Sequence, residues 1–153
     1  MRILFAENDD EHYAAAVKGL SRLLTAATFE RVKSESSFLE WLKQVGSGDH
    51  PLVDAIVLDW RLPWSSVIDE IFRRPDDREI GADFAGLRCL KALENSVIWH
   101  TRVVVYTALG VWDIKPELQV LQTKPPVLEK GHAAELAKLL LVPLASQATS
   151  SSW

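Results

Sequence analysis

The chain has 153 residues, of which 48% are hydrophobic and 25% charged, and its formal net charge is −4. This length and composition predict one globular domain with a substantial core, and the acidic balance gives no electrostatic reason to expect direct binding to nucleic acid. The single cysteine excludes an internal disulfide and fits a reducing compartment.

Two stretches bear on export and membrane insertion. The start of the chain lacks the apolar stretch and the small-residue cleavage site of a signal peptide. The apolar run 139–144 is far shorter than the ~20 residues that a helix needs to cross a bilayer. We therefore expect a cytoplasmic protein without membrane contact.

Short apolar runs alternate with helical patterns along the whole chain. We expect strands at 2–6, 28–33, 53–59, 102–107 and 126–129, with 28–33 at an edge of the sheet. Helices are expected at 11–27, from Ser36 or Ser37 through Leu42, at 81–95 and at 132–141, with a loop at 46–51. The segment 110–122 is ambiguous, because Pro116 either interrupts a helix or starts one.

This alternation of strands and helices predicts an α/β fold. Five strand–helix repeats with right-handed crossovers and one reversal give a doubly wound, five-stranded parallel sheet of flavodoxin-like order 2-1-3-4-5. We expect one domain over residues 1–144, with an exposed insertion at about 64–80 that includes a charged run broken by Pro75. Residues 145–153 are rich in serine, and we expect a flexible tail there.

Polar and charged residues stand where four of the expected strands end. Glu7, Asn8, Asp9 and Asp10 follow the first strand, Asp59 ends the third, Thr107 ends the fourth and Lys130 follows the fifth. In an open α/β sheet, ligands bind beyond the carboxyl ends of the strands, where the strand order reverses. We therefore expect one pocket with carboxylates, a hydroxyl and an ammonium, which suits a divalent cation and a phosphoryl group. We assign Asp10 only to the start of the following helix, where a negative charge is favourable.

Four short motifs, in this order and spacing, resemble the response-regulator receiver domain of two-component signalling. They are ILFAENDDE at the first strand, VLDWRLP at the third, VVVYTA at the fourth and VLEK before the last helix. The resemblance covers residues 1–144, apart from the insertion after Pro63.

The resemblance implies a role for each residue at the strand ends. Asp59 would accept a phosphoryl group from a histidine kinase or a phosphotransfer protein, and Thr107 and Lys130 would contact that group. Mg²⁺ would be held by Glu7, Asn8, Asp9, Asp59 and the backbone carbonyl of Arg61. Such a protein is a switch and not an enzyme: the added charge would alter a surface on the fourth helix, the fifth strand and the last helix. That surface would bind a downstream protein partner or form a homodimer.

One departure from the receiver pattern concerns the metal ligands. Asn8 stands where the principal acidic ligand is expected, and an amide oxygen brings no charge. A shift of one residue would place Asp9 there instead. The alternative function is therefore a pseudo-receiver, an interaction module that has the fold but is not phosphorylated.

Two further departures lie near the fifth strand. Gly131 replaces the usual proline after Lys130, so we expect a trans peptide bond, because non-proline cis bonds cost ~2.5 to 4 kcal/mol. Val127 stands where the family often has a switching aromatic, so the coupling of that aromatic to the threonine is absent or involves Tyr106.

Two residues close to Asp59 bear on its reactivity. Leu109, two residues after the threonine, would exclude attacking water, so we predict slow self-dephosphorylation. Arg61 stands where phosphohydrolases of haloacid-dehalogenase type have a second aspartate, which argues against that enzyme class. A flavin-binding function would fit the sheet order, but no phosphate-cradling loop follows the first strand.

The remaining distinctive side chains receive mainly structural assignments. We expect Trp41 and Trp99 to be in the core or half-buried, and Cys89 to be buried. Trp60 and Trp64 flank the acceptor loop and belong either to a partner surface or to the interior. The four histidines show no metal-ligand spacing and receive no catalytic role.

Overall fold

The computed structural model describes residues 1–64 and 84–142. In chain order its elements are β1 (Arg2–Ala6), α1 (Asp10–Leu23), β2 (Thr28–Val32), α2 (Glu35–Ser47), β3 (Ala55–Leu58), α3 (Ala85–Glu94), β4 (Arg102–Thr107), α4 (Val111–Leu118), β5 (Val127–Glu129) and α5 (Ala133–Leu141). The strands form one five-stranded parallel sheet in the order β2-β1-β3-β4-β5. The predicted doubly wound fold is therefore confirmed, including β2 at the edge.

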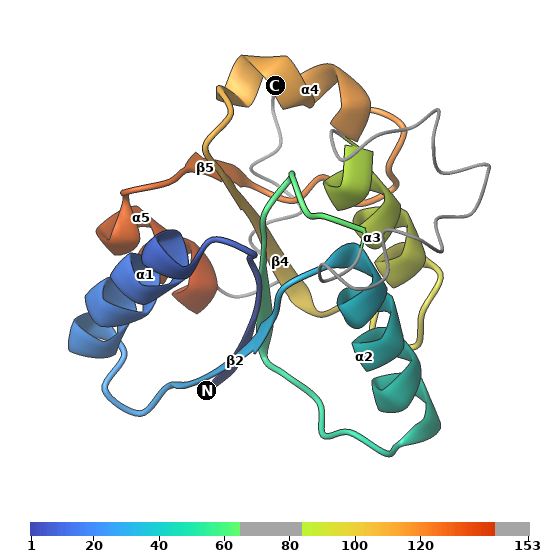
Figure 1. The fold of residues 1–153 in the computed structure, drawn as a ribbon, viewed down its shortest axis with the longest axis horizontal. Coiled ribbons are helices and arrows are strands. Elements are labelled where there is room, and N and C mark those ends of the chain that lie inside the picture. Colours follow the sequence, from blue (N-terminus) through green and yellow to red (C-terminus); the bar gives the residue numbers. More distant parts are fainter. Residues whose placement is uncertain (65–83, 143–153) are drawn as a thin grey trace.

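The sheet is covered by helices on both faces, with α1 and α5 on one side and α2 and α3 on the other (Figure 1). Along β1, Ile3 and Phe5 pack with α1 and α5, whereas Leu4 and Ala6 pack with α2 and α3. Successive side chains of a strand point to opposite faces, so a strand buried on both faces must be apolar at every position. This explains why the central strands were recognisable as uninterrupted apolar runs.

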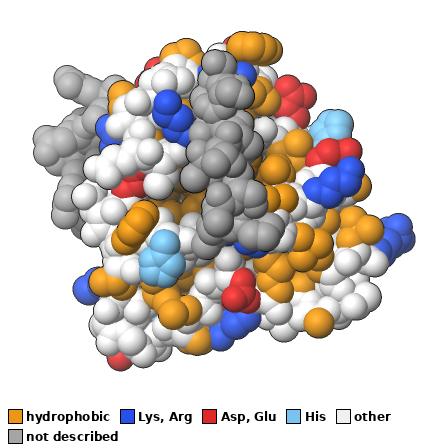
Figure 2. Space-filling model, turned by 180° about the vertical axis from the view of Figure 1, so that it is seen from behind, with side chains coloured by type: hydrophobic (Ala, Val, Ile, Leu, Met, Phe, Trp, Pro, Cys, Tyr) orange, Lys and Arg blue, Asp and Glu red, His pale blue; other side chains and the backbone are white. Residues whose placement is uncertain are grey.

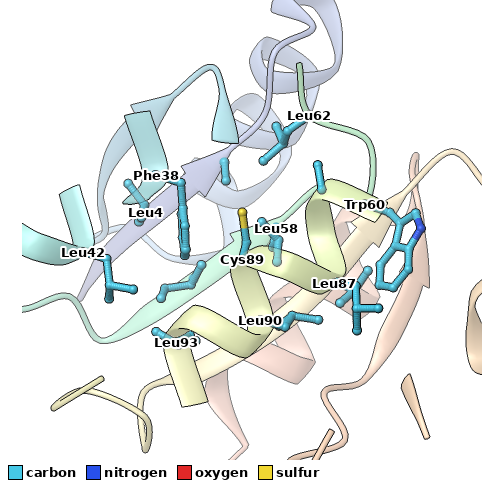
Figure 3. Close-up of a cluster of buried hydrophobic side chains, with 14 of the residues drawn as sticks. Leu4, Phe38, Leu42, Leu58, Trp60, Leu62, Leu87, Cys89, Leu90 and Leu93 are labelled. Carbon is cyan, nitrogen blue, oxygen red and sulfur yellow. The ribbon is translucent and has the colours of Figure 1, made fainter. Parts of the chain in front are cut away.

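Trp60 lies in the core cluster on the α3 side, only 2% exposed, although it directly follows the acidic end of β3. Figure 3 shows its ring beside Leu87, in the same cluster as Cys89 and Leu90. Gly86 permits this approach, because a Cβ there would lie 2.8 Å from the Trp60 Cα. The interior assignment of Trp60 is thus correct, and a partner surface at this residue is excluded.

The loop that follows β3 is held between α2 and α3. Backbone N–H groups at the start of α2 donate to it, from Glu35 to Pro63 O and from Ser36 to Trp64 O, both at 2.8 Å. The Glu35 carboxylate, 1% exposed, accepts two 2.6 Å hydrogen bonds from the Arg88 guanidinium on α3. This bidentate ion pair therefore joins the two helix starts that flank the loop.

Several predicted boundaries differ from the structure. α1 ends at Leu23, four residues before the predicted end, and α2 continues through Gly46 and Ser47, which were predicted as loop. The turn comes instead at Gly48, whose φ of 82° is left-handed and whose N–H closes the helix on Gln44 and Val45. The ambiguous segment contains α4, with Pro116 inside the helix. The predicted insertion after Trp64, the predicted helical residues 81–83 and the predicted tail 145–153 lie outside the described residues.

The buried and exposed side chains correct one further assignment. Trp41 is buried as predicted, but Trp99 is 57% exposed, because it lies in the turn between α3 and β4. Cys89 is buried, and burial raises the pKa of its thiol far above the ordinary value, which fits a purely apolar role.

Figure 2 shows hydrophobic side chains gathered in several places between charged ones on one face of the molecule. Within the described residues, no helix has the length and apolar character needed to cross a membrane.

The ion pair between Glu35 and Arg88 gives a first prediction. Arg88→Leu should lower the free energy of unfolding by about 3–5 kcal/mol, because it leaves a buried carboxylate without its partner. Urea unfolding measures this loss, and Lys91→Leu, at an exposed position of the same helix, is the matched control. The double variant Glu35→Leu, Arg88→Leu should recover most of the loss. A loss below about 1 kcal/mol in Arg88→Leu would contradict the assigned role.

Candidate functional site

The carboxyl ends of β1, β3 and β5 bring three charged side chains together. The Lys130 ammonium lies 2.8 Å from Asp59 Oδ2 and 2.6 Å from Glu7 Oε2. All three side chains are more than nine-tenths buried, with Lys130 at 8% exposed. The predicted convergence of Glu7, Asp59 and Lys130 is therefore present in the structure.

Main-chain hydrogen bonds that continue the sheet fix the backbone positions of these three residues. The Glu7 N–H donates to Val32 O at 3.0 Å, and the Asp59 N–H donates to Ala6 O at 2.9 Å. The Lys130 N–H donates to Thr107 O at 2.9 Å. Because each bond extends the pairing of two neighbouring strands by one residue, the sheet register itself places these backbones at one edge.

The electrostatic environment keeps Lys130 charged. Burial acts to lower the pKa of Lys130, but hydrogen bonds and charges from Asp59 and Glu7 outweigh it, and the net effect raises that pKa above its ordinary value. The ammonium in turn separates two carboxylates that would otherwise repel each other. The cluster therefore consists of two carboxylates and one ammonium, and Asp59 and Lys130 of this cluster line the adjacent pocket.

A pocket of about 390 Å³ opens beside this cluster. Six of the residues predicted for the site line it: Asn8, Asp9, Asp59, Arg61, Thr107 and Lys130. Its other lining residues are His12, Leu62, Pro63, Ala108 and Leu109. Glu7 is not among the lining residues; its carboxylate contacts the Lys130 ammonium and the Asp9 N–H.

The two central carboxylates differ in how their oxygens are occupied. Glu7 Oε1 accepts from the Asp9 N–H at 2.9 Å, and Glu7 Oε2 accepts from Lys130. Asp59 Oδ2 also accepts from Lys130, but within residues 1–64 and 84–142 the one contact of Asp59 Oδ1 is a long one, 3.4 Å from the Arg61 N–H. Asp59 therefore presents the more available oxygen, and it alone of the two carboxylates lines the pocket.

The acidic residues after Glu7 have separate structural tasks. Asp9 caps α1 by accepting from the His12 N–H at 2.8 Å, and this backbone hydrogen bond lowers the pKa of Asp9. Asp10 contacts Lys33 at 2.8 Å and Arg31 at 2.6 Å, and these two partners lower its pKa. Asp10 is not among the pocket-lining residues, in agreement with its predicted role at the start of α1.

His12 is a pocket residue that the sequence analysis missed. Its Nδ1 lies 3.4 Å from the Lys130 Nζ and 3.6 Å from Asp9 Oδ1. The signal that could have found it is helical spacing, since the third residue after a helix cap lies on the same side as the cap. Its contact with Lys130 thus brings an imidazole into the lining of the pocket.

The side chains present fit a hard divalent cation. Carboxylate oxygens of Glu7 and Asp59, the Asn8 amide and backbone carbonyls are oxygen donors of the kind that Mg²⁺ prefers, with water completing its shell. Residues 1–64 and 84–142 contain no group of three or more His, Cys, Asp or Glu side chains placed to hold a metal by themselves.

Thr107 lies at the strand end where it was predicted, and the Lys130–Gly131 peptide bond has the predicted trans conformation. Thr107 is buried at the end of β4, and its Oγ1 accepts from the Leu109 N–H at 3.2 Å. The described residues contain no cis peptide bond, so Lys130–Gly131 is trans. Tyr106, the residue before Thr107, points to the opposite face of the sheet and packs with α1 and α5.

The charged cluster gives a second prediction, based on pH. In the native protein, the stability contributed by Lys130 is fully present below the ordinary pKa of 10.5 and is lost as the pH rises through its higher folded-state pKa. In Lys130→Met, the repulsion between Glu7 and Asp59 should raise the pKa of one carboxylate. The variant should then lose stability as the pH rises from about 4 to 7, by roughly 1–3 kcal/mol.

Urea unfolding at several pH values measures both effects. Lys33→Met is the matched control, because Lys33 contacts the exposed Asp10 and should leave the pH profile near neutrality unchanged. A Lys130→Met profile parallel to that of the native protein would contradict the repulsion between the two carboxylates.

Comparison with known proteins places this geometry in a known fold. Neither the protein-family models nor the curated protein sequences match the chain. A two-component response regulator from Legionella pneumophila is 20% identical, with 95% of this chain and 98% of that one covered and a TM-score of 0.66. The Mn²⁺-bound form of response regulator Rcp1 is 17% identical, with coverage of 99% and 93% and a TM-score of 0.63. The phosphorylated cyanobacterial phytochrome response regulator RcpA is 15% identical, with coverage of 91% and 87% and a TM-score of 0.64. The chain therefore has the fold of a response-regulator receiver domain.

Proposed function

We propose that this chain is a phospho-accepting receiver whose Mg²⁺-dependent modification at Asp59 switches a protein-interaction surface. The main support is the unequal occupancy of the two carboxylates. Both Glu7 oxygens have short hydrogen bonds, whereas Asp59 lines the pocket and its Oδ1 has one long contact among the described residues. Asp59 is thus the carboxylate that a phosphoryl donor can reach.

The proposed reaction is transfer of a phosphoryl group from a phosphohistidine of a kinase or phosphotransfer protein. An Asp59 oxygen forms the new bond to phosphorus, the phosphorus–nitrogen bond breaks, and the imidazole of the donor leaves with the electron pair. Transfer of this kind depends on positioning and charge neutralisation. Lys130 already contacts Asp59 and can follow a phosphoryl oxygen, and the Thr107 hydroxyl can donate to another.

Mg²⁺ would be held by Asp59, Glu7, the Asn8 amide, the second oxygen of Asp9 and the Arg61 carbonyl. Bound there, it would neutralise charge on the transferring group. The neutral Asn8 reduces the number of charged ligands, so we expect weak metal binding in the absence of a phosphoryl group. The structurally similar response regulator Rcp1 has a Mn²⁺-bound form, which supports binding of a divalent metal in this fold.

We place the output surface on α4, β5 and α5, with a downstream protein or a second copy of the chain as partner. Trp112 on α4 is 79% exposed, and the Lys115 ammonium lies 4.0 Å from its ring centroid. A large exposed aromatic beside a cation is typical of an interface anchor. We expect such a module to act in the cytoplasm, where its phosphoryl donors act.

The second candidate is a pseudo-receiver, which Asn8 favours because it removes one negative charge from the metal site. In that case the existing contacts of Lys130 with Glu7 and Asp59 would be purely structural. The two candidates differ in one observable, the covalent modification of Asp59.

Labelling with acetyl phosphate and Mg²⁺ is the third prediction. The native chain should acquire an acid-stable, base-labile phosphoryl group, Asp59→Asn should acquire none, and chelation of the metal should reduce the rate at least about tenfold. Asp10→Asn is the matched control, because Asp10 is acidic and close in sequence but lies outside the pocket, and it should label normally. Phosphate-affinity gels and mass spectrometry measure the product.

Two results of this experiment would count against the receiver function. An unlabelled native chain at millimolar donor would favour the pseudo-receiver. Equal labelling of Asp59→Asn would place the modification elsewhere.

The lifetime of the label is the fourth prediction. Leu109, Leu62 and Pro63 give the pocket an apolar lining around Asp59, which limits the approach of water. We expect slow loss of the phosphoryl group, and Leu109→Ser should accelerate it about threefold to tenfold, equivalent to roughly 0.7–1.4 kcal/mol of barrier. Label retention after donor removal measures this rate, with Val120→Ser, at an exposed position, as control. Loss within seconds from the native chain would contradict the shielding.

A further inference from the structure

Tyr106 connects the far side of the sheet to the loop that contains Lys130. Its side chain is 4% exposed among the residues that pack with α1 and α5, on the face opposite to Thr107. The Tyr106 hydroxyl accepts a 2.8 Å hydrogen bond from the Gly131 N–H. A buried tyrosine hydroxyl usually finds such a partner, but here the partner is the residue directly after Lys130.

The connection between β5 and α5 consists of three residues, Lys130, Gly131 and His132. The Lys130 N–H donates to the Thr107 carbonyl, and the next N–H, from Gly131, donates to the Tyr106 hydroxyl. Two consecutive donors of the loop are thus fixed by two consecutive residues of β4. The two peptide units that flank Lys130 are therefore each hydrogen-bonded to β4, one through the Lys130 N–H and the other through the Gly131 N–H.

The flexibility of Gly131 explains why the hydrogen bond to the Tyr106 hydroxyl matters. Its φ of 98° is left-handed, a conformation that suits glycine, and nothing lies within 4 Å of the position where a Cβ would be. Glycine has more backbone freedom than any other residue, so a loop of this kind is loose unless another group holds it. In the described structure, the Tyr106 hydroxyl is the side chain that bonds the Gly131 N–H.

We propose that Tyr106 is a positioning residue for Lys130: its hydroxyl fixes the Lys130–Gly131 peptide and thereby sets the ammonium against Glu7 and Asp59. The ammonium meets two buried carboxylates at 2.6 and 2.8 Å at once, which requires a defined direction of the lysine side chain from its backbone. The expected effect of Tyr106 on phosphoryl transfer rests on the proposed function, whereas its effect on the position of the Lys130 side chain does not.

Tyr106→Phe in the full chain tests the proposal, because it removes the hydroxyl and retains the ring. Tyr13→Phe is the matched control: it alters the other tyrosine of the chain, which packs by its ring against Phe5 and lies under Arg31. Three measurements are made on each variant: amide exchange at Gly131, the nitrogen chemical shift of the Lys130 ammonium, and the rate of acetyl-phosphate labelling.

In Tyr106→Phe, Gly131 amide exchange should accelerate about threefold to tenfold, the range expected for loss of one hydrogen bond. The Lys130 ammonium signal should move, while the Lys33 signal should not. The rate of acetyl-phosphate labelling should fall by the same factor, about threefold to tenfold. All three should be unchanged in Tyr13→Phe. A merely structural loss would lower stability without a selective change at Lys130.

A second variant keeps the test decisive if Tyr106→Phe is generally destabilised. Gly131→Asn retains the N–H, and asparagine tolerates the left-handed conformation, whereas Gly131→Val strongly disfavours it. The Lys130 signal should therefore be retained in Gly131→Asn and displaced in Gly131→Val. Equal displacement in both variants would overturn the proposal.

Unchanged Gly131 exchange and an unchanged Lys130 signal in Tyr106→Phe would also overturn it. If the native chain is not labelled at all, the receiver function fails. The exchange and ammonium measurements still decide the role of Tyr106, so the two failures are distinguishable.

Discussion

The contact of one ammonium with two buried carboxylates is the constraint around which this molecule is arranged. Burying charge is expensive, and removing one partner of such a group leaves an uncompensated charge. Lys130 can contact Glu7 and Asp59 because β1 lies beside β3 and because β5 runs parallel to both, so that the carboxyl ends of all three strands lie on the same side of the sheet. The charged cluster therefore depends on the strand order: the apolar runs set the order, and the order brings the three charges together.

The loop after Asp59 shows how the fold restrains the reactive side of this cluster. It is held from α2 by the N–H groups of Glu35 and Ser36, and from α3 by the Gly86 N–H, which donates to Trp60 O at 2.8 Å. The buried pair of Glu35 and Arg88 fixes these helices to each other. Asp59 thus leaves β3 into a segment with little freedom, which suits chemistry that depends on position more than on acid–base catalysis.

The sequence predicted those features that depend on local pattern. The central strands are apolar at every position, as with residues 3–6, so their location, their parallel order and the residues at their ends followed directly. Trp60 and the pair of Glu35 with Arg88 were not predictable in this way, because their burial depends on Gly86 and on contacts 53 residues apart. Trp99 was assigned by residue type to the core or to a half-buried position, but it lies in a turn and is 57% exposed, because burial in a turn is decided by the surrounding chain. The hydrogen bond from Gly131 to Tyr106 likewise joins residues 25 positions apart and has no local signal.

The same contacts suggest how a change at Asp59 would spread if the chain is a receiver. A phosphoryl group would bring about 1.5 to 2 negative charges to a cluster that already has one more carboxylate than ammonium. The side chain of Lys130 can follow a phosphoryl oxygen, but its backbone is held, because it is hydrogen-bonded to Thr107 O and, through the Gly131 N–H, to Tyr106. The adjustment would then fall on the opposite side of the pocket, where the Thr107 hydroxyl is joined to the Leu109 N–H just before α4. A shift of Thr107 toward the phosphoryl group would alter that bond and with it the start of the helix that presents Trp112. The rigid attachment of Lys130 is thus what would direct the response toward α4.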